Sequence, residues 1–187
     1  MLSDAKLLVQ LQAGDDASFE ALFLRHYDRI YNILYRLLGN RADAEDVAQQ
    51  VFLKLYHSPR RVRLQGDEAN VSGWLYRVAV NSGYNMLRSH KRERARREKG
   101  GWLWLLNWSS SDPEDITASK DIQSRVRFIL AELKPRDAKL LILRYSGLSY
   151  KELAVALDLS PGSIGSTLTR AERAFAKKYR LAFPERA

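Results

Sequence analysis

The chain has 187 residues and a formal net charge of +9 at pH 7, from 31 Lys and Arg against 22 Asp and Glu. It contains no cysteine, which excludes a disulfide scaffold, a thiolate zinc site and a cysteine nucleophile. Its 45% hydrophobic residues argue against wholesale disorder. No apolar run approaches the roughly 20 residues that a membrane span needs, and the N-terminus lacks a signal-peptide pattern. The basic surplus points to a polyanionic partner.

The positive charge lies in two blocks. Residues 1–57 carry a net charge of −2, residues 58–101 carry +7, residues 102–124 carry −3 and residues 125–187 carry +7. One explanation is that each block forms a solvent-exposed face with a chance excess of positive charge. Two contacts on one long polyanion explain the separation more simply.

Apolar residues recur at helical spacing throughout, and no segment alternates as a strand would, so the pattern predicts an all-α protein. A first long helix is predicted over residues 19–37 and ends at Gly39-Asn40. A second helix follows over residues 44–55 and is closed by Pro59. Its polar face would repel DNA and therefore favours a protein partner, with plain amphipathicity as the alternative. The face contains acidic and amide side chains: Asp43, Glu45, Asp46, Gln49 and Gln50.

A third long helix is predicted after an Arg-rich polar loop at residues 60–70. Ser72 is expected to cap this helix, which runs on toward Lys99. One stripe of it combines aromatic, amide and guanidinium groups, which suit stacking on unpaired bases and phosphate binding: Trp74, Arg77, Asn81, Tyr84, Asn85 and Arg88. A core position is the strong alternative for Trp74, and a solvated face is an equal alternative for the arginines.

A break at Gly100-Gly101 divides the chain into two small helical domains, residues 1–99 and 119–187, joined by a flexible linker at 100–118. The linker is unusual because it carries three tryptophans, Trp102, Trp104 and Trp108.

The last two helices predict a helix-turn-helix. Ser149 and Glu152 form a capping-box pattern, and Ser160-Pro161 opens the final helix. In such units the second helix enters the major groove. Its outer stripe is predicted to carry hydroxyl and basic groups: Ser163, Ser166, Thr167, Arg170, Arg173 and Lys177. A structural hairpin is the alternative, but charge and caps together favour DNA binding.

Catalytic constellations are missing from the sequence. It has no glycine-rich phosphate loop and no Gly-x-Ser-x-Gly, and His26, His57 and His90 lack metal-ligand spacing. Each histidine is expected at the surface or with its hydrogen bonds satisfied. We therefore expect no metal, no cofactor and no enzymatic activity.

Several segments, in this order and spacing, resemble the extracytoplasmic-function (ECF) sigma factors, the small two-domain class of bacterial transcription initiation factor. The N-terminal domain resembles region 2 through three segments, at residues 19–27, 44–52 and 74–81. The C-terminal domain resembles region 4 through four segments, at residues 133–137, 143–145 and 147–154 and in the helix opening at Ser160. The resemblance covers nearly the whole chain except the Trp-containing linker.

The resemblance implies a cytoplasmic subunit that catalyses no reaction itself and directs core RNA polymerase to promoters. The second helix would dock on the clamp helices of the largest subunit through Asp46, Gln49, Gln50 and Phe52, and the C-terminal domain on the flap of the second-largest. The linker would thread toward the active-site and RNA-exit channels, and an anti-sigma factor would regulate the protein.

Two further residue sets are implied to bind promoter DNA. The minus-ten element would be melted and read by Leu64, Gln65, Gly66, Asp67, Asn70, Trp74, Arg77, Asn81, Asn85 and Arg88. The minus-thirty-five element would be read as duplex by Ser163, Ser166, Thr169, Arg170 and Arg173.

The sequence departs from the family pattern at Gln50, often Glu, and at Gly165, Thr167 and Glu172, where basic residues are usual. These departures predict an altered or less charge-driven promoter preference. A one-component regulator with a ligand-sensing N-terminal domain is the main alternative function, and a nucleic-acid-modifying enzyme is a distant third.

Overall fold

The computed structural model describes residues 2–62, 64–65, 68–97 and 118–184. The N-terminal part begins with three helices, α1 (Asp4–Gln12), α2 (Asp16–Leu38) and α3 (Arg41–His57). Helix α1 was not predicted from the sequence. Its nine residues bury Leu7, Leu8 and Leu11, and the Ser3 side chain accepts a hydrogen bond from the backbone N–H of Lys6. A helix this short depends on packing more than on its own propensity.

The predicted boundary between α2 and α3 is confirmed. Gly39 has a φ of +69° and ends α2 in the left-handed conformation that glycine adopts without a Cβ penalty. Asn40 then caps α3, since its side-chain oxygen accepts a hydrogen bond of 3.0 Å from the backbone N–H of Asp43. This dipeptide therefore ends one helix and starts the next.

The polar loop after α3 contains local structure that the sequence did not predict. A 3₁₀ turn, η1 (Pro59–Arg61), is followed by a two-stranded antiparallel hairpin of β1 (Leu64–Gln65) and β2 (Glu68–Ala69), with Leu64 opposite Ala69. Helix α4 (Val71–Arg97) follows. Its cap is Asn70 and not Ser72, because the Asn70 side-chain oxygen accepts from the backbone N–H of Gly73 at 2.6 Å.

The C-terminal part consists of α5 (Ala118–Glu132), α6 (Pro135–Tyr145), α7 (Tyr150–Leu157), the 3₁₀ turn η3 (Pro161–Ser163) and α8 (Ile164–Ala182). The predicted capping box is confirmed in both directions: the Ser149 side chain accepts from the Glu152 N–H, and the Glu152 carboxylate accepts from the Ser149 N–H. The all-helical two-domain fold is as predicted, apart from the small hairpin.

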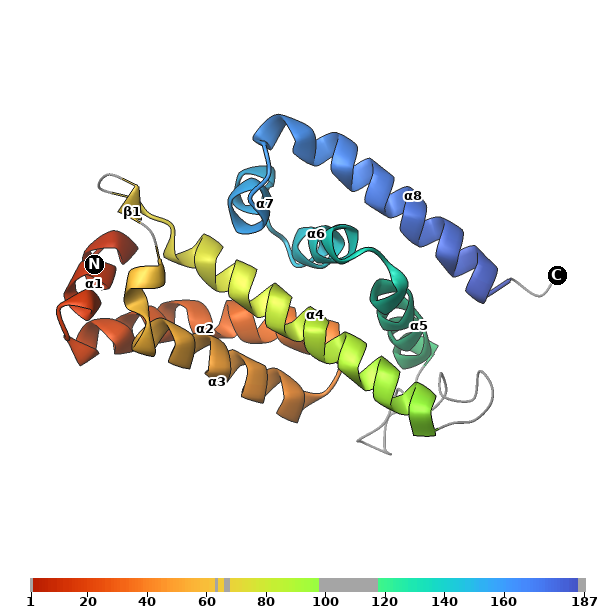
Figure 1. Ribbon diagram of the computed structural model, residues 1–187, viewed down its shortest axis with the longest axis horizontal. Helices are drawn as coiled ribbons and strands as arrows, with labels where there is room; N and C mark the ends of the chain where they lie inside the picture. Colours follow the sequence, from red (N-terminus) through yellow and green to blue (C-terminus); the bar gives the residue numbers. More distant parts are fainter. Residues whose placement is uncertain (1, 63, 66–67, 98–117, 185–187) are drawn as a thin grey trace.

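Helix α4 lies between the two halves, with α2 and α3 on one side and α5, α6 and α7 on the other (Figure 1). The buried apolar side chains of both halves form one continuous cluster that extends from Leu7 to Ala171. The domains are therefore packed against each other, and the exposure of each candidate surface depends on this packing.

Candidate nucleic-acid and polymerase interfaces

The outer face of α3 is polar and exposed. Asp46, Gln49 and Gln50 are all exposed, and Leu53, one turn after Gln49, is 44% exposed. The structure thus brings together three of the four predicted docking residues and adds an exposed leucine that the sequence analysis missed. The signal that could have found it is its position in the sequence, four residues after Gln49 and therefore on the polar side of the helix, whereas Leu55 continues the apolar spacing of Val51.

The prediction placed Phe52 on the docking face of this helix, but the structure buries it. Its side chain is 1% exposed, and its ring packs edge-on against Phe23 with centroids 4.9 Å apart and close to Tyr27 at 6.1 Å. Aromatic rings in this arrangement stabilise the core of the N-terminal domain. Phe52 therefore supports α3 from beneath and is not available to a partner in this structure.

The α7–α8 pair has the geometry of a helix-turn-helix. Asp158 ends α7 with a φ of +57°, and the backbone N–H of Leu159 then donates to the Ala154 carbonyl at 2.8 Å. Asp is one of the few residues besides Gly that adopts this conformation readily. The chain then turns through η3 into α8, whose apolar face, including Ile164 and Ala171, is buried.

Four of the five predicted minus-thirty-five residues lie exposed on α8. They are Ser166, Thr169, Arg170 and Arg173, while Ser163 is half-buried. Ser166 and Thr169 donate their hydroxyl protons to the carbonyls of Ser163 and Gly165, at 3.2 and 3.1 Å. Their oxygen lone pairs therefore remain available as acceptors.

Two residues of α8 differ from its exposed basic face. Thr167 contradicts the predicted outer stripe, and Glu172, where the family usually has a basic residue, has a hydrogen-bond partner on α6. Thr167 is 6% exposed and faces the core. Glu172 accepts a hydrogen bond of 3.2 Å from the Tyr145 hydroxyl of α6. The basic character of the exposed face therefore comes from Arg170, whose side chain is 65% exposed, and Arg173.

The predicted minus-ten residues do not form one exposed surface. Leu64 and Gln65 belong to β1, whereas Gly66, Asp67 and the linker tryptophans lie outside the described residues. Asn70 is exposed but its side chain is engaged as the α4 cap. Trp74 and Asn81 are half-buried, with Trp74 packed on the core, while Asn85 and Arg88 are exposed.

Arg77 and Tyr84, both on the predicted stripe of α4, are bound to the C-terminal domain. The Arg77 guanidinium donates to the carbonyl oxygens of Val155 at 2.7 Å and Ala156 at 2.9 Å. These carbonyls belong to the last turn of α7, where Val155 accepts only a long hydrogen bond of 3.4 Å from the Asp158 N–H and the helix end favours a cation. Tyr84 is 1% exposed and donates its hydroxyl proton to the Leu133 carbonyl at 2.9 Å.

Ion pairs add to this contact along its length. Arg29 of α2 lies 3.2 Å from Glu152 of α7, and Lys91 of α4 pairs with Glu132 of α5. Burial acts to raise the pKa of Glu152, but hydrogen bonds from Ser149 and the charge of Arg29 outweigh it and lower the pKa. Such partly exposed pairs each contribute little, so they orient the domains more than they stabilise them.

Arg127 is a buried cation at the same domain boundary. It is 5% exposed, and burial lowers its pKa to about 10. Its guanidinium lies over Gly39, where a Cβ would come within 2.5 Å of the Arg127 Cζ atom. Among the described residues its Nε atom meets no hydrogen-bond acceptor. A buried charge with incomplete hydrogen bonding weakens the packed arrangement.

The three histidines have ordinary environments, and His57 is exposed at the end of α3. His26 is 9% exposed and its Nε2 lies 2.7 Å from the Asp4 carboxylate, while His90 lies 3.7 Å from Asp43. Within the described ranges, no three His, Asp or Glu side chains gather as a metal site would require. None of the described helices is long and apolar enough to cross a membrane.

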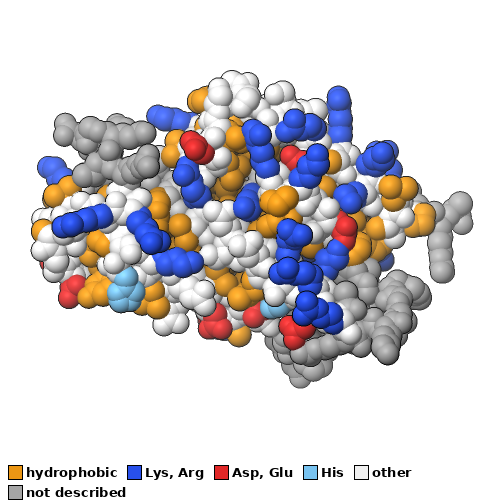
Figure 2. Space-filling model, viewed as in Figure 1, with side chains coloured by type: hydrophobic (Ala, Val, Ile, Leu, Met, Phe, Trp, Pro, Cys, Tyr) orange, Lys and Arg blue, Asp and Glu red, His pale blue; other side chains and the backbone are white. Residues whose placement is uncertain are grey.

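Basic side chains dominate the face of the molecule shown in Figure 2, over both halves, with acidic side chains scattered between them. Helices α4 and α8 each contribute a stripe with arginines, and among the described residues the α4 stripe alone is hydrogen-bonded to the other domain, through Arg77 and Tyr84. Sequence analysis could not predict this difference, because the carbonyl groups that bind Arg77 carry no residue-type signal.

Two family models match the chain: sigma-70 region 2 matches residues 22–93 and sigma-70 region 4 matches residues 123–175. The ECF RNA polymerase sigma-E factor of Escherichia coli K12 is 31% identical over 95% of this chain and 94% of its own length. The RNA polymerase sigma-H factor of Pseudomonas aeruginosa is 30% identical over 93% of this chain and 92% of its own.

Two solved structures share the fold at 20% identity. CnrH, solved in complex with the cytosolic domain of CnrY, has a TM-score of 0.60 over 94% of this chain and 96% of its own. The sigma factor RpoE of Bartonella quintana, solved with the anti-sigma factor NepR, has a TM-score of 0.54 over 90% and 98%. With both region models matched in order and sigma factors related along nearly its full length, the chain belongs to the ECF sigma factors, non-catalytic initiation factors that direct RNA polymerase to promoters.

Proposed function

We propose that the protein binds core RNA polymerase and promoter DNA through three separate helical surfaces, carried by domains 1–99 and 119–187 and joined by the linker 100–118. One observation carries this assignment: two exposed helix faces have opposite chemistry. The α3 face presents Asp46, Gln49 and Gln50, whereas the α8 face presents Arg170 and Arg173.

The α3 face binds the clamp helices of the largest polymerase subunit. Its carboxylate and amide groups disfavour DNA and suit a basic or polar protein surface. Leu53, 44% exposed, supplies an apolar contact beside them, and an apolar centre with a polar rim is typical of protein interfaces. The C-terminal domain contacts the flap of the second-largest subunit.

The α8 face reads the minus-thirty-five element as duplex DNA. Arginine guanidinium groups bind guanine edges or phosphates, and the free lone pairs of Ser166 and Thr169 accept hydrogen bonds from base amino groups. The short row of basic groups on this face makes binding depend less on salt than for a factor with more arginines.

The loop at residues 64–70 and the α4 stripe melt and read the minus-ten element. For this, Arg77 must leave the carbonyls of Val155 and Ala156, since one guanidinium cannot bind them and DNA phosphates at the same time. The promoter-bound form therefore has the two domains separated. Separation exposes Tyr84, which then contributes an aromatic ring to the stripe.

The protein acts in the cytoplasm without catalysing a reaction, and an anti-sigma factor regulates it. Support for this partner comes from RpoE of Bartonella quintana, whose structure contains the anti-sigma factor NepR.

Run-off transcription over a random promoter library, with core polymerase alone and with this protein, tests the proposal. We expect promoter-dependent products only when the protein is present. Replacing both Asp46 and Gln49 by Ala should abolish them by weakening polymerase binding, whereas Glu20→Ala, an exposed change on α2, should not. The absence of any promoter-dependent product would overturn the proposal.

A further inference from the structure

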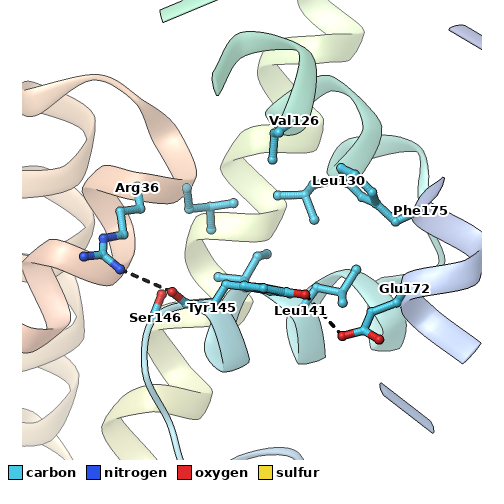
Figure 3. A pocket seen from close by; sticks show the side chains of 10 residues that line it. Arg36, Val126, Leu130, Leu141, Tyr145, Ser146, Glu172 and Phe175 are labelled. Carbon is cyan, nitrogen blue, oxygen red and sulfur yellow. Dashed lines mark hydrogen bonds between the residues drawn. The ribbon is translucent and has the colours of Figure 1, made fainter. Parts of the chain in front are cut away.

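A cavity of about 540 Å³ lies between the two domains, where α2 faces α5, α6 and α8 (Figure 3). Its walls are mainly apolar and include Leu37 of α2, Leu130 of α5, Leu141 of α6 and Phe175 of α8. This volume lies within the range of pockets that bind small organic ligands, and such pockets are typically apolar with a few polar groups and lie at domain interfaces.

Polar groups occur at two ends of the cavity. Arg36 reaches one end from α2, where its Nη1 donates to the Tyr145 carbonyl at 3.2 Å. The other N–H groups of this guanidinium meet no acceptor within the described part of the chain. At the far end the Glu172 carboxylate already accepts from the Tyr145 hydroxyl at 3.2 Å. The carboxylate can accept further hydrogen bonds, so the cavity has a cationic end at Arg36 and an anionic end at Glu172, and an anionic head is favoured only at the Arg36 end.

Both domains are needed to form this cavity. Arg36 and Leu37 come from the N-terminal domain, whereas Leu130, Leu141 and Phe175 come from the C-terminal domain. Separation of the domains would remove one wall and the cationic end together. A ligand that contacts both sides therefore binds the packed arrangement more tightly, and by linkage it shifts the population toward that arrangement.

We propose that this cavity binds an amphipathic small molecule with a carboxylate head and an aliphatic body, and that the bound molecule holds the domains together. The head pairs with the Arg36 guanidinium, since carboxylates form strong, charge-assisted hydrogen bonds with arginine. The body lies along Leu37, Leu130 and Phe175. The binding claim stands on the cavity alone. The consequence, repression of minus-ten binding, rests on the proposed function.

Dodecanoate is a suitable probe, with dodecanol and dodecylamine as amphiphiles of the same chain length and a different head. Calorimetric titration of the full chain should detect one saturable site for dodecanoate. Arg36→Gln should weaken dodecanoate binding by about tenfold and change dodecanol binding little. Val126→Phe, which places a ring in the half-buried wall of the cavity, should abolish binding of all three. Arg41→Gln, an exposed change on α3, is the matched control.

Domain closure can be followed separately, because the chain has no cysteine and accepts two dyes at introduced positions. Leu24 of α2 and Leu181 of α8 are 70% and 74% exposed, so Leu24→Cys and Leu181→Cys provide labelling sites on the two domains. Dodecanoate should raise the energy transfer between the dyes and keep it high to a greater urea concentration. The same addition should reduce run-off transcription.

Equal binding of the three amphiphiles, or dodecanoate binding that neither Arg36→Gln nor Val126→Phe alters, would overturn the site. Binding without a change in energy transfer would overturn its coupling to closure. If the protein failed to support transcription at all, the proposed function would fall, while the titration and the energy transfer would still decide the site.

Discussion

The α4 stripe and the outer face of α8 both carry arginines, but these arginines differ in availability. On α8, Arg170 and Arg173 are exposed, and the ion-pair neighbour of Arg170, Asp137 of α6 at 3.9 Å, belongs to the same domain. On α4, Arg77 binds two carbonyls of α7, and Tyr84 is buried against Leu133. A guanidinium binds any well-placed oxygen acceptor, so the property that suits Arg77 for phosphates also lets the helix end of α7 compete for it.

This difference implies an order of events in promoter recognition. Under the proposed function, the face that reads duplex DNA is exposed in the packed form, whereas Arg77 and Tyr84 of the stripe that reads single strands become free only when the domains separate. The polar closing contacts are hydrogen bonds of about 0.5–1.5 kcal/mol each and partly exposed ion pairs worth less. The apolar core shared by the two domains adds to them, whereas the buried, incompletely hydrogen-bonded guanidinium of Arg127 opposes closure. Polymerase and promoter binding must together outweigh this sum for the domains to separate.

The largest effect should come from making the packed form permanent. Lys91 and Glu132 contact each other across the domains, so Lys91→Cys and Glu132→Cys can be joined by a cleavable bismaleimide. We expect run-off transcription to fall by about a hundredfold, since few molecules could then open. Binding to a minus-thirty-five duplex, measured by fluorescence anisotropy, should change little because α8 stays exposed.

Cleavage of the cross-link should restore transcription, and the double variant capped with a monofunctional maleimide serves as control. Full transcription by the cross-linked protein would show that the α4 stripe works in the packed form.

The next largest effect should come from the outer face of α8. Arg170→Ala removes an exposed guanidinium from α8 and should weaken duplex binding by about 1–3 kcal/mol if it contacts a base, or lower the salt slope by about one if it contacts a phosphate. Arg180→Ala, an exposed arginine in the last turn of the same helix, is the control. Equal affinity and salt slope for Arg170→Ala and the unaltered protein would remove Arg170 from the interface.

A smaller effect is expected from the α4 stripe. Tyr84→Phe keeps the ring but removes the hydrogen bond to the Leu133 carbonyl, which should favour separation of the domains by about 1 kcal/mol. Energy transfer between dyes on α2 and α8 should then fall, and less urea should be needed to open the domains. Tyr56→Phe, at an exposed tyrosine of α3, should leave the signal unaltered. A Tyr84 variant that opens no more readily would contradict a closing role for this contact.

Features set by neighbouring residues were predictable from the sequence. Gly39-Asn40 ends one helix and caps the next, and the Ser149–Glu152 capping box forms as its spacing requires, because these contacts span only a few residues. Two nearby residues that can both cap a helix caused one error, in the predicted N-cap of α4. Asn70 and Ser72 are both good caps, and the backbone course decided for Asn70.

Features set by distant residues were not predictable. Tyr84 is an amphipathic side chain whose position on a helix fits either an exposed or a buried face, and its burial depends on the packing of the C-terminal domain. Phe52 is different, because it recurs at the apolar helical spacing of Ala48, Val51 and Leu55, which predicts burial, and its docking role was implied only by the family resemblance. Periodicity gives the face of a helix, but it does not say which other helix covers that face.

The smallest expected effect concerns the stability of α8 alone. Gly165 lies in the first turn of α8, and a Cβ there would meet its nearest described neighbour, Tyr150 Cε2, at an ordinary 3.9 Å. Gly165→Ala should therefore stabilise the protein by about 0.5–1 kcal/mol, chiefly by lowering the entropy of the unfolded chain. Gly147→Ala is a control of opposite sign: no atom is within 4 Å of a Cβ at that position, but the φ of +91° is strained for alanine.

Thermal unfolding measures both changes in stability. A higher midpoint for Gly165→Ala and a lower one for Gly147→Ala would show that backbone conformation, and not packing of the added methyl group, decides the effect. Neither substitution alters the Arg77 or Tyr84 contacts, so energy transfer between the domains should stay constant in both variants. A change in energy transfer for Gly165→Ala would mean that the free and the closed faces are coupled through α8, and the two stripes would then no longer count as independent surfaces.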